Sequence, residues 1–358
     1  MRVLIAPDKF AGTLTAVEAA EAMADGWRRH APADVLDLAP MADGGPGFVD
    51  VLHAALGGTV LAVTVSGPHG TPVPATVLLV EDTAYVESAQ ACGVHLLDGP
   101  AETASTVGVG ELLVAALEAG ATRVVVGLGG SGTNDGGAGL LAALGATGAP
   151  TDGAAGLPAV TGTDLAPARA RVAGVELVVA SDVDNPLTGL FGATKTFGPQ
   201  KGISEDRIAV VDGWLEGWAA ATDRRTSLQK GAGAAGGLGF ALLLLGATRA
   251  PGIALVTDAV GLPARARAAD LVVTGEGAFD FSSRSGKVPY GVAEVAGEAV
   301  RPCVALAGQV LVGSREMRAL GIESAYSLVD LVGEDRAFAD PAGALADLAE
   351  RVARTWSR

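Results

Sequence analysis

The sequence predicts an α/β protein built from a discontinuous Rossmann-like parallel-sheet domain and a second α/β domain inserted into it. Near both ends of the chain, short apolar runs alternate with helical patterns, which is typical of parallel strand–helix–strand units. Between these ends, strands alternate apolar and polar residues, as antiparallel hairpins do. Glycine-rich loops follow several strands, and 51 of the 358 residues are glycine. Because ligands often bind between two domains, we expect the site in the interdomain cleft.

The N-terminal part opens with MRVLIAPDKF, in which an apolar run ends at Pro7. This run predicts a buried strand. In the helix that follows, Thr15 is the expected N-cap, and Glu18 completes a capping box. The expected elements of this part are a strand over 2–6, a helix over 13–30, a strand over 35–38 and a helix over 48–56.

The middle of the chain begins with hairpin strands from residue 59, with turns at GPHG and EDT. Further strands and helices follow, and residues 146–172 are expected to be loop-rich because they contain Gly and Pro without a period. The expected elements are a helix over 109–119, a strand from 123, a helix in LLAALGA, a strand from 175, a helix over 206–221 and a helix in FALLLLGA.

The C-terminal part returns to the alternation of strands and helices. Its expected elements are a strand from 271, a helix over 287–300, strands from 302 and in SAYSLVD, and a closing helix over 342–356. We therefore expect residues 1–62 and 270–358 to form the Rossmann-like domain and residues 63–269 to form the inserted domain.

Charge and apolar length argue against several classes of function. The formal net charge is −15, and an acidic surface repels nucleic-acid phosphates, so we expect no nucleic-acid partner. The chain has no basic run for an anionic membrane and no apolar stretch long enough to span one, so we expect no membrane partner. The apolar run at the N-terminus is too short for a signal peptide, which predicts a cytoplasmic protein. We expect a monomer or a homodimer.

Charged residues stand where two of the predicted strands end. In APDKFAGTL, Asp8 and Lys9 follow the first strand, and Lys9 could hold a phosphate or a substrate carboxylate. In PMADGGPG, Asp43 precedes two glycines whose N–H groups can turn toward an anion. The alternative for both motifs is an ordinary turn.

The motif GLGGSGTNDGGAG lies between a predicted strand and a predicted helix and is rich in glycine and polar side chains. A helix N-terminus carries about half a positive charge, and glycine lets a phosphate approach the backbone. The motif lacks the Gly-Lys-Ser/Thr of a Walker loop. A purely structural glycine loop is the alternative, but such a loop would not need so many polar side chains.

Two further motifs mix acidic and basic residues. Asp182 and Asp184 follow a strand and could recruit Mg²⁺, which binds one or two carboxylates together with phosphate oxygens; an Asx-rich turn is the alternative. The loop TGEGAFDFSSRSGK suits metal, nucleotide and anion binding through Glu276, Asp280, Arg284 and Lys287. Asp182 and Asp184 belong to the longer segment 181–202, and GAGAAGGLG is a further glycine-rich motif. All lysines of the chain lie in or beside these motifs, at positions 9, 195, 201, 230 and 287, which favours phosphate binding.

In their order along the chain, APDKFAGTL, MADGGPG, GGSGTNDGGAG, DVDNPLTG with FGPQKG, GAGAAGGLG, and TGEG with a later GK resemble the bacterial glycerate kinase family. The resemblance covers nearly the whole chain and is to the two-domain branch without a P-loop. It implies phosphorylation of D-glycerate by ATP with Mg²⁺, most often at the 2-hydroxyl. Two positions depart from the family pattern, because Pro46 stands where the family usually has Glu and Ser282 where it usually has Gln.

Phosphoryl transfer needs mostly positioning and charge neutralisation, which side chains of these types can provide. The catalytic candidates, which would hold glycerate or the moving phosphoryl group or act on the acceptor hydroxyl, are Asp8, Lys9, Asp280, Arg284 and Lys287. The candidates for ATP binding are Gly129, Gly130, Ser131, Thr133, Asn134, Asp135, Gly136, Gly137, Lys201, Gly236 and Gly237. The candidates for Mg²⁺ are Asp182, Asp184 and Glu276.

Two other functions stay open at this point. Compared with the family pattern, the chain lacks a carboxylate at Pro46 and an amide at Ser282. These two differences favour a kinase of a related small hydroxy acid. A non-catalytic metabolite-sensing relative would keep the fold without the reaction. The surviving Asp, Lys and Gly motifs argue against the sensor.

Overall fold

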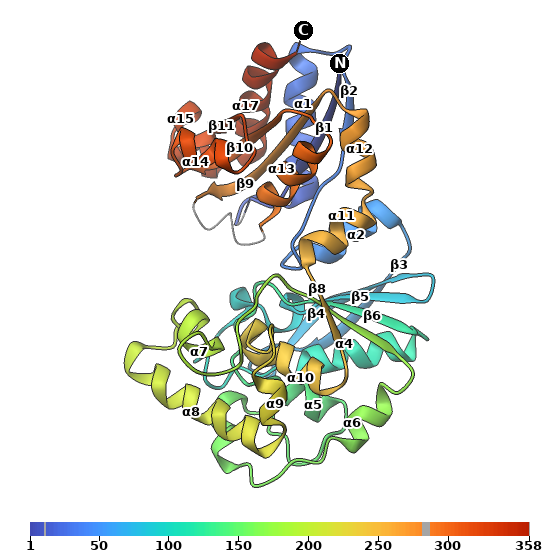
Figure 1. Cartoon of the computed structure of the whole chain (residues 1–358), viewed down its shortest axis with the longest axis vertical. Helices are drawn as coiled ribbons and strands as arrows, with labels where there is room; N and C mark the ends of the chain where they lie inside the picture. The colour runs from blue at the N-terminus through green and yellow to red at the C-terminus, as the bar shows by residue number, and fades with distance from the viewer. Residues whose placement is uncertain (11, 281–286, 358) are drawn as a thin grey trace. The chain divides into compact units, whose positions relative to one another are not determined.

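The computed structural model describes residues 1–10, 12–280 and 287–357 (Figure 1). The chain divides into two compact units, each of which is described by itself. The first unit comprises Met1–Asp43, Asp50–Leu56 and Ile253–Arg358, and the second comprises Gly44–Val49 and Gly57–Gly252. Apart from the short segment 44–49, the chain passes from the first unit to the second near residue 57 and returns near residue 253. The sequence predicts these domain boundaries near residues 62 and 270.

The first unit contains a parallel sheet with the strand order β11-β10-β9-β1-β2 (Figure 1). Its strands are β1 (Arg2–Pro7), β2 (Val35–Leu38), β9 (Leu271–Phe279), β10 (Cys303–Val310) and β11 (Ser324–Ser327). Strands β1 and β9 are mostly buried apolar runs, as expected when helices cover both faces of a parallel sheet. The predicted α/β class with a parallel sheet is confirmed.

The strand order of this sheet reverses between β1 and β9. From β1 the chain proceeds to β2 on one side, whereas β9, β10 and β11 follow on the other side. Open α/β sheets bind ligands at the carboxyl ends of the strands where the order reverses. Pro7 pairs with Gly275, so Asp8 and Glu276 stand next to each other at this edge.

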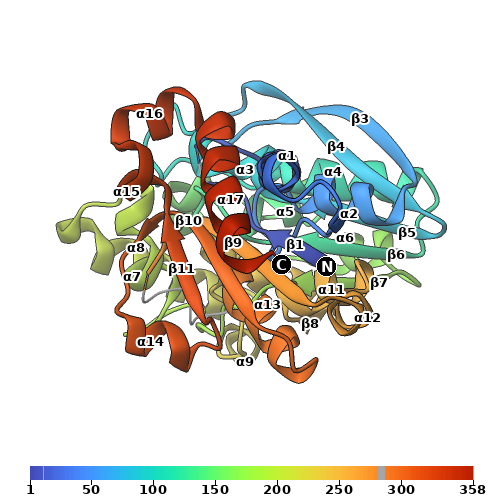
Figure 2. The same ribbon diagram turned by 90° about the horizontal axis from the view of Figure 1, so that it is seen from above.

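Helices cover the sheet of the first unit. Helix α1 (Ala16–His30) begins at the predicted capping box, where Thr15 Oγ1 accepts from Glu18 N at 3.1 Å and Glu18 Oε2 accepts from Thr15 N at 2.9 Å. Helix α17 (Pro341–Trp356) packs along α1 (Figure 2). The other helices are α2 (Phe48–Leu56), whose first residues belong to the second unit, α11 (Gly252–Ala259), α12 (Leu262–Ala268), α13 (Val288–Glu298), α14 (Ser314–Ala319), α15 (Leu328–Val332) and α16 (Glu334–Ala339).

The core of the first unit lies between the sheet and the helices α1 and α17. Helix α1 buries Met23 and Trp27, and Trp27 Nε1 donates to Asp34 Oδ2 at 3.0 Å. Helix α17 contributes Leu345 and Leu348 to the same core. This packing supports the strands whose ends carry the acidic side chains.

The second unit contains a mixed sheet with the order β3-β4-β5-β6-β7-β8. Its strands are β3 (Thr59–Ser66), β4 (Pro72–Val80), β5 (Thr83–Glu87), β6 (Arg123–Gly127), β7 (Glu176–Ala180) and β8 (Thr248–Ala250). The first three strands pair antiparallel, and β5 to β8 pair parallel. The hairpins and the parallel strands predicted for this part are both present.

Short helices connect the strands of the second unit. The α-helices are α3 (Ala89–Cys92), α4 (Val107–Glu118), α5 (Ala138–Ala143), α6 (Ala166–Arg171), α7 (Ala193–Phe197), α8 (Glu205–Ala221), α9 (Arg224–Ser227) and α10 (Leu238–Leu244). The 3₁₀ helices are η1 (Val94–Leu96), η2 (Gly153–Ala159), η3 (Pro199–Lys201) and η4 (Ala234–Gly237). Among the described residues of the whole chain, every helix is too short or too polar to cross a membrane.

The structure corrects several local predictions. The sequence predicts a loop-rich segment over 146–172, whereas the structure has η2 and α6 there, two elements too short to show a helical period. The sequence also predicts a strand throughout SAYSLVD. Strand β11 ends at Ser327 instead, because its Oγ accepts from Asp330 N at 3.1 Å and caps α15. Helices α11 and α12 are not predicted, since Gly261 and Pro263 interrupt their pattern.

Candidate active site

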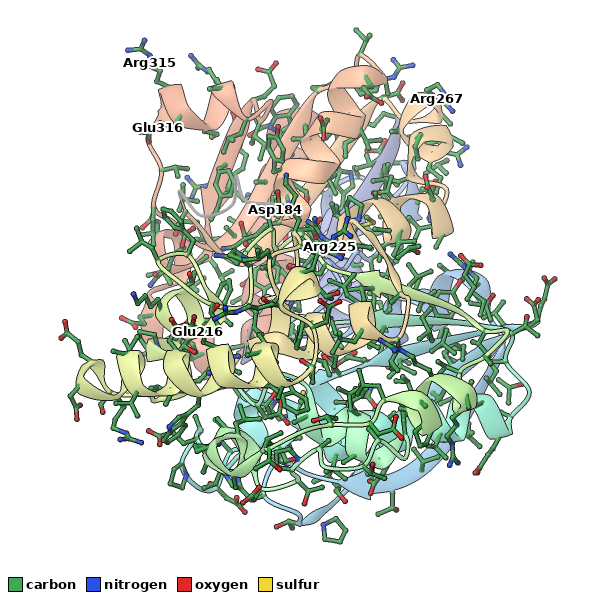
Figure 3. All side chains as sticks on the ribbon, turned by 60° about the horizontal axis from the view of Figure 1, so that its bottom comes forward. Asp184, Glu216, Arg225, Arg267, Arg315 and Glu316 are labelled. Carbon is green, nitrogen blue, oxygen red and sulfur yellow. The ribbon has the colours of Figure 1, made fainter. Side chains whose placement is uncertain are left out.

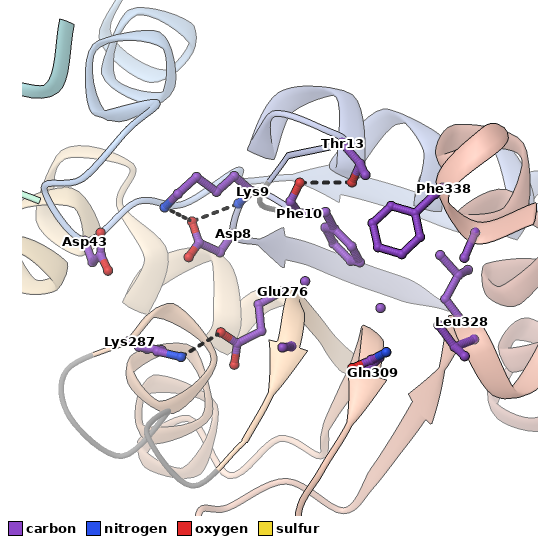
Figure 4. Close-up of a pocket in the computed structure, with 15 residues that line it drawn as sticks. Asp8, Lys9, Phe10, Thr13, Asp43, Glu276, Lys287, Gln309, Leu328 and Phe338 are labelled. Carbon is purple, nitrogen blue, oxygen red and sulfur yellow. Dashed lines mark hydrogen bonds and ion pairs between the residues drawn. The ribbon is translucent and has the colours of Figure 1, made fainter. Parts of the chain in front are cut away.

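A pocket of about 430 Å³ lies at the carboxyl edge of the sheet in the first unit (Figure 4). The charged side chains that line it are Asp8, Lys9, Asp43, Glu276 and Lys287. They come from the end of β1, the segment after β2, the strand β9 and the residue before α13. The structure thus brings together four predicted site residues, Asp8, Lys9, Glu276 and Lys287, that come from two distant parts of the sequence.

Asp8 is held at the end of β1 with 6% of its surface exposed. Its N–H donates to Gly275 O at 2.8 Å, and its Oδ1 accepts from Lys9 N at 2.8 Å and lies 3.5 Å from Lys9 Nζ. Burial raises the pKa of Asp8 to about 6, Lys9 opposes this rise, and the Asp43 charge adds to it. Such a carboxylate is deprotonated at neutral pH and can still accept a proton, which suits a general base.

Lys287 stands between two carboxylates at the same pocket. It is the N-cap residue of α13, and its Nζ lies 3.7 Å from Glu276 Oε2 and 3.6 Å from Asp280 Oδ1. Glu276 is 5% exposed, whereas 33% of the Lys287 side chain is exposed. The ammonium group can therefore meet an anionic ligand in the pocket. Arg284 and Ser282 lie outside the described residues.

The acidic residues of the pocket provide carboxylate oxygens, which are ligands that Mg²⁺ prefers. This ion usually takes one or two carboxylates and completes its coordination with water and phosphate oxygens. Asp8, Asp43 and Glu276 line the pocket, but the described residues contain no group of three or more His, Cys, Asp or Glu that could hold a metal alone. A metal ion here would therefore depend on a phosphorylated ligand for part of its coordination.

The other end of the pocket is apolar, and no motif of the sequence predicts it. Its lining includes Phe10, Leu328, Val329, Ala337 and Phe338, with the amide of Gln309 nearby (Figure 4). Apart from Phe10, these residues come from β10, α15 and α16, outside every motif. No sequence signal marks them, because single apolar residues in short helices usually fill a core.

The glycine-rich loop of the second unit lies between β6 and α5 and contains the buried Asp135. Asp135 accepts hydrogen bonds from Thr106 N at 2.9 Å, Thr106 Oγ1 at 2.8 Å, Gly137 N at 2.9 Å and Gly139 N at 3.2 Å. Burial raises the pKa of Asp135, and these hydrogen bonds oppose the rise. The carboxylate thus links the starts of α4 and α5 by hydrogen bonds, and its oxygens accept from groups of the protein itself.

Lys201 is buried beside the same loop, with 5% of its surface exposed. Its Nζ donates to Thr133 O at 2.6 Å and to Ser131 Oγ at 3.5 Å. Burial lowers the pKa of Lys201 to about 8, while Cys92 and Asp135 oppose this shift. In this structure Lys201 binds the loop itself, and the ATP-binding role of Lys201, Ser131 and Thr133 stays a prediction.

The glycines of this loop pack against other parts of the second unit. A Cβ atom at Gly136 would lie 2.5 Å from Trp218 Cδ1, and one at Gly130 would lie 2.7 Å from Pro46 Cγ. A Cβ would also be too close to its neighbours at Gly129, Gly137, Gly236 and Gly237. Close packing is therefore a sufficient reason for glycine at each of these positions.

Backbone N–H groups and a side-chain amide of the loop also donate hydrogen bonds within the second unit. Gly129 N donates to Gly44 O at 3.0 Å, and Gly136 N donates to Gly236 O at 3.0 Å. Asn134 Nδ2 donates to the Thr194 hydroxyl at 2.9 Å. A phosphate could accept hydrogen bonds from these N–H groups only if their hydrogen bonds within the unit broke. Nucleotide binding by this loop stays a prediction, and it would have to use other donors.

Gly130→Val should lower the free energy of unfolding by about 2–5 kcal/mol, because valine adds left-handed backbone strain and a clash. Gly130 has φ +77°, and its Cβ would meet the Pro46 ring. Thermal denaturation measures the effect. Gly174→Val is the matched control, since Gly174 has φ +81° with no neighbour within 4 Å and would suffer the strain alone. Equal melting temperatures of the two variants, with ATP stabilisation lost only in Gly130→Val, would favour a phosphate loop instead.

Asp184 lies on the exposed loop after β7 (Figure 3). Lys230 Nζ donates to its Oδ2 at 3.0 Å, and Arg249 Nη2 lies 2.6 Å from its Oδ1. Hydrogen bonds from Lys230 and Arg249 lower the pKa of Asp184. The carboxylate is thus paired with two cations of the second unit. The roles of Asp182 and Asp184 as Mg²⁺ ligands stay predictions.

Comparison with known proteins gives one consistent result. A family model described as "Glycerate kinase family" matches residues 3–357. The glycerate kinase of Bacillus subtilis is 40% identical over 351 residues, which cover 92% of this chain and 90% of that protein. The glycerate 2-kinase of Escherichia coli is 38% identical over 362 residues, which cover 94% and 93%. A crystal structure assigned to glycerate kinase 2 of Salmonella typhimurium LT2 has a TM-score of 0.81 and 35% identity, and covers 99% of this chain and 98% of that one.

Proposed function

The chain belongs to the glycerate kinase family and is an enzyme that phosphorylates glycerate, and we propose that it transfers the γ-phosphoryl group of ATP, with Mg²⁺, to the 2-hydroxyl of D-glycerate in the cytoplasm. One observation carries the assignment of the chemistry to the first unit. Asp8, whose pKa is raised to about 6, shares a pocket with Lys9 and with the Lys287–Glu276 pair. This pocket lies where the strand order of a parallel sheet reverses.

Asp8 is the proposed general base. As the acceptor oxygen of glycerate forms its bond to the γ-phosphorus, its proton passes to the Asp8 carboxylate. The bond from this phosphorus to the bridging oxygen breaks, and ADP leaves with that oxygen. Burial keeps the Asp8 pKa near 6, so the group is ionised at neutral pH and basic enough to take the proton. The hydrogen bond from Lys9 N fixes one carboxylate oxygen.

Lys9 and Lys287 are the proposed ligands of the anionic groups. Glycerate carries a carboxylate, and the transferring phosphoryl group spreads negative charge over its oxygens in the transition state. An ammonium group aimed at such charge in a partly enclosed pocket stabilises the transition state more than the ground state. Both lysines line the pocket and are partly exposed to it. Asp280 and Arg284, from the same sequence motif as Lys287, remain proposed partners.

Glu276 is the proposed Mg²⁺ ligand of the first unit. Its carboxylate is nearly buried at the pocket and faces the Lys287 ammonium group. When bound, Mg²⁺ would neutralise charge on the phosphate oxygens. Lys287 would then hold Glu276 in place and limit repulsion between its carboxylate and the phosphates. Asp182 and Asp184 are further proposed ligands from the second unit.

An assay with ATP, Mg²⁺ and D-glycerate, coupled to the release of ADP, tests the proposed function. We expect turnover that depends on Mg²⁺, and NMR of the product should show 2-phosphoglycerate. Formation of 3-phosphoglycerate would overturn the choice of hydroxyl and leave the kinase assignment intact. Turnover of another small hydroxy acid in place of D-glycerate would support the alternative that Pro46 and Ser282 suggest.

A further inference from the structure

We propose that the apolar end of the pocket in the first unit binds the adenine base of the phosphoryl donor. We call this end, formed by Phe10, Leu328, Val329, Ala337 and Phe338, the base subsite. The inference rests on the proposed function, because only a nucleotide donor brings a base to the pocket. It places the donor along the edge of one sheet, with its phosphates toward the charged end and its base toward α15 and α16.

The size of the pocket is the first argument. Its volume is about 430 Å³, within the usual range for small-molecule sites. Pockets of this size usually enclose most of a drug-sized ligand, and glycerate, with only three carbons, is much smaller than such a ligand. Glycerate alone therefore leaves the apolar end of the pocket without an occupant.

The distribution of polarity along the pocket is the second argument. Figure 4 shows the charged side chains around Asp8 and Lys287 at one end, and the rings of Phe10 and Phe338 with Leu328 at the other. Glycerate is polar along its whole length, so burying it against apolar side chains would cost free energy. A nucleoside triphosphate has the same distribution as the pocket, with anionic phosphates at one end and a flat base with apolar faces at the other.

Phe338 is the third argument, because it is a large apolar side chain that the fold leaves uncovered. It lies on α16 with 63% of its surface exposed, whereas Phe10 is 3% exposed and belongs to the core. An exposed aromatic ring at a pocket is a surface on which a base can stack. Phe338 would therefore cover one side of the subsite, and the buried Phe10 would form part of its wall.

Gln309 supplies a polar group beside the base subsite. It lies in β10, lines the pocket and is only partly exposed. Its side-chain amide has a donor and an acceptor in one plane. Adenine carries a neighbouring donor and acceptor on its edge, the amino group and a ring nitrogen, which glutamine can match with two hydrogen bonds. Gln309 thus gives the subsite a means to orient the base.

Calorimetric titration of the full-length protein with Mg²⁺ and either ADP or pyrophosphate tests the subsite. Phe338→Ala should raise the Kd for ADP about tenfold or more, because one base-stacking contact is lost, and should leave the Kd for pyrophosphate unchanged. Phe338→Tyr keeps an aromatic ring and should restore ADP binding. Phe191→Ala is the matched control, since Phe191 is 69% exposed in the second unit and lines no part of this pocket. It should bind both ligands as the wild type does.

Three results would overturn the base subsite. These are an unchanged Kd for ADP in Phe338→Ala, an equal loss of ADP and pyrophosphate binding, and a wild type that binds no ADP. A raised KM for glycerate with normal ADP binding would assign the apolar end to the acceptor and would also reject the proposal. If the wild type binds ADP but does not phosphorylate glycerate, the proposed function fails, while the comparison of ADP with pyrophosphate still decides the subsite.

Discussion

Asp8→Asn should lower kcat for glycerate phosphorylation by about 10²–10⁴-fold, the usual contribution of a general base. Asparagine has nearly the same shape as aspartate, and its amide oxygen can still accept the Lys9 N–H that Asp8 Oδ1 accepts at 2.8 Å. It cannot, however, take the proton of the acceptor hydroxyl. Steady-state kinetics with D-glycerate and ATP measures the effect, and a variant with wild-type kcat would exclude Asp8 as the base.

The pH dependence of the wild type provides a second readout for Asp8. Because burial raises its pKa to about 6, the base is protonated below this pH and ionised above it. The value of kcat/KM should therefore rise with pH through about 6 and then level off. The profile of Asp8→Asn should lack this step, since the variant has no carboxylate at this position. A purely structural role would not remove the step.

The same substitution should not weaken the fold at neutral pH. A carboxyl whose pKa is raised in the folded protein binds its proton more tightly there than in the unfolded chain. Its ionisation therefore lowers stability as the pH rises from about 3.8 to about 6, and the full loss persists above that range. Asp8→Asn removes this loss, so its melting temperature at neutral pH should equal or exceed that of the wild type. Asp25→Asn is the matched control, because Asp25 is exposed and pairs with Arg28 at 3.1 Å, away from the pocket lining; its kcat should not change.

Lys287→Ala should lower kcat/KM by about 10²-fold or more, because a charge-assisted contact to the transferring group is lost. In the wild type the Nζ atom lies 3.7 Å from Glu276 and 3.6 Å from Asp280. Without it, both carboxylates lose this ammonium group and face the anionic ligands with less compensating charge. The loss of activity should therefore exceed that expected from a missing contact alone.

Two variants separate this role of Lys287 from a general effect of charge. Lys287→Arg keeps the positive charge and should recover part of the activity, although its planar group does not reproduce the ammonium geometry. Arg28→Ala removes a cation from the exposed face of α1, where Arg28 pairs with Asp25, and should leave the kinetics unchanged. A Lys287→Ala enzyme with kcat/KM within about twofold of the wild type would remove Lys287 from the site.

Short-range sequence patterns determined several elements of the fold. The capping box of Thr15 and Glu18 places the start of α1, and the apolar run before Pro7 gives β1 nearly as predicted. These features depend on hydrogen bonds and burial within a few residues, so the sequence shows them directly. The same reasoning placed Asp8 and Lys9 at a binding edge, because the carboxyl ends of parallel strands meet there.

The glycine-rich loop can be interpreted only with tertiary contacts that the sequence does not show. Glycine and polar residues before a helix are compatible with a phosphate cradle, which the many polar side chains favour, and also with close packing. The structure buries Asp135 under four hydrogen bonds and sets Gly130 against Pro46 and Gly136 against Trp218. The partners of these groups come from distant segments, so only the folded chain reveals that close packing is a sufficient reason for these glycines. Nucleotide binding by the loop stays a prediction.

By itself, the sequence determined the α/β class, the family resemblance and the charged residues of the pocket, because each follows from a local pattern or an ordered set of motifs. Tertiary structure alone decided two other properties of the site. The raised pKa of Asp8 arises from its burial at the sheet edge, with a further contribution from Asp43. The apolar end of the pocket exists because α15 and α16 place Leu328 and Phe338 at the pocket that Phe10 also lines. Both properties depend on which segments become neighbours in space, and separation along the chain hides that information.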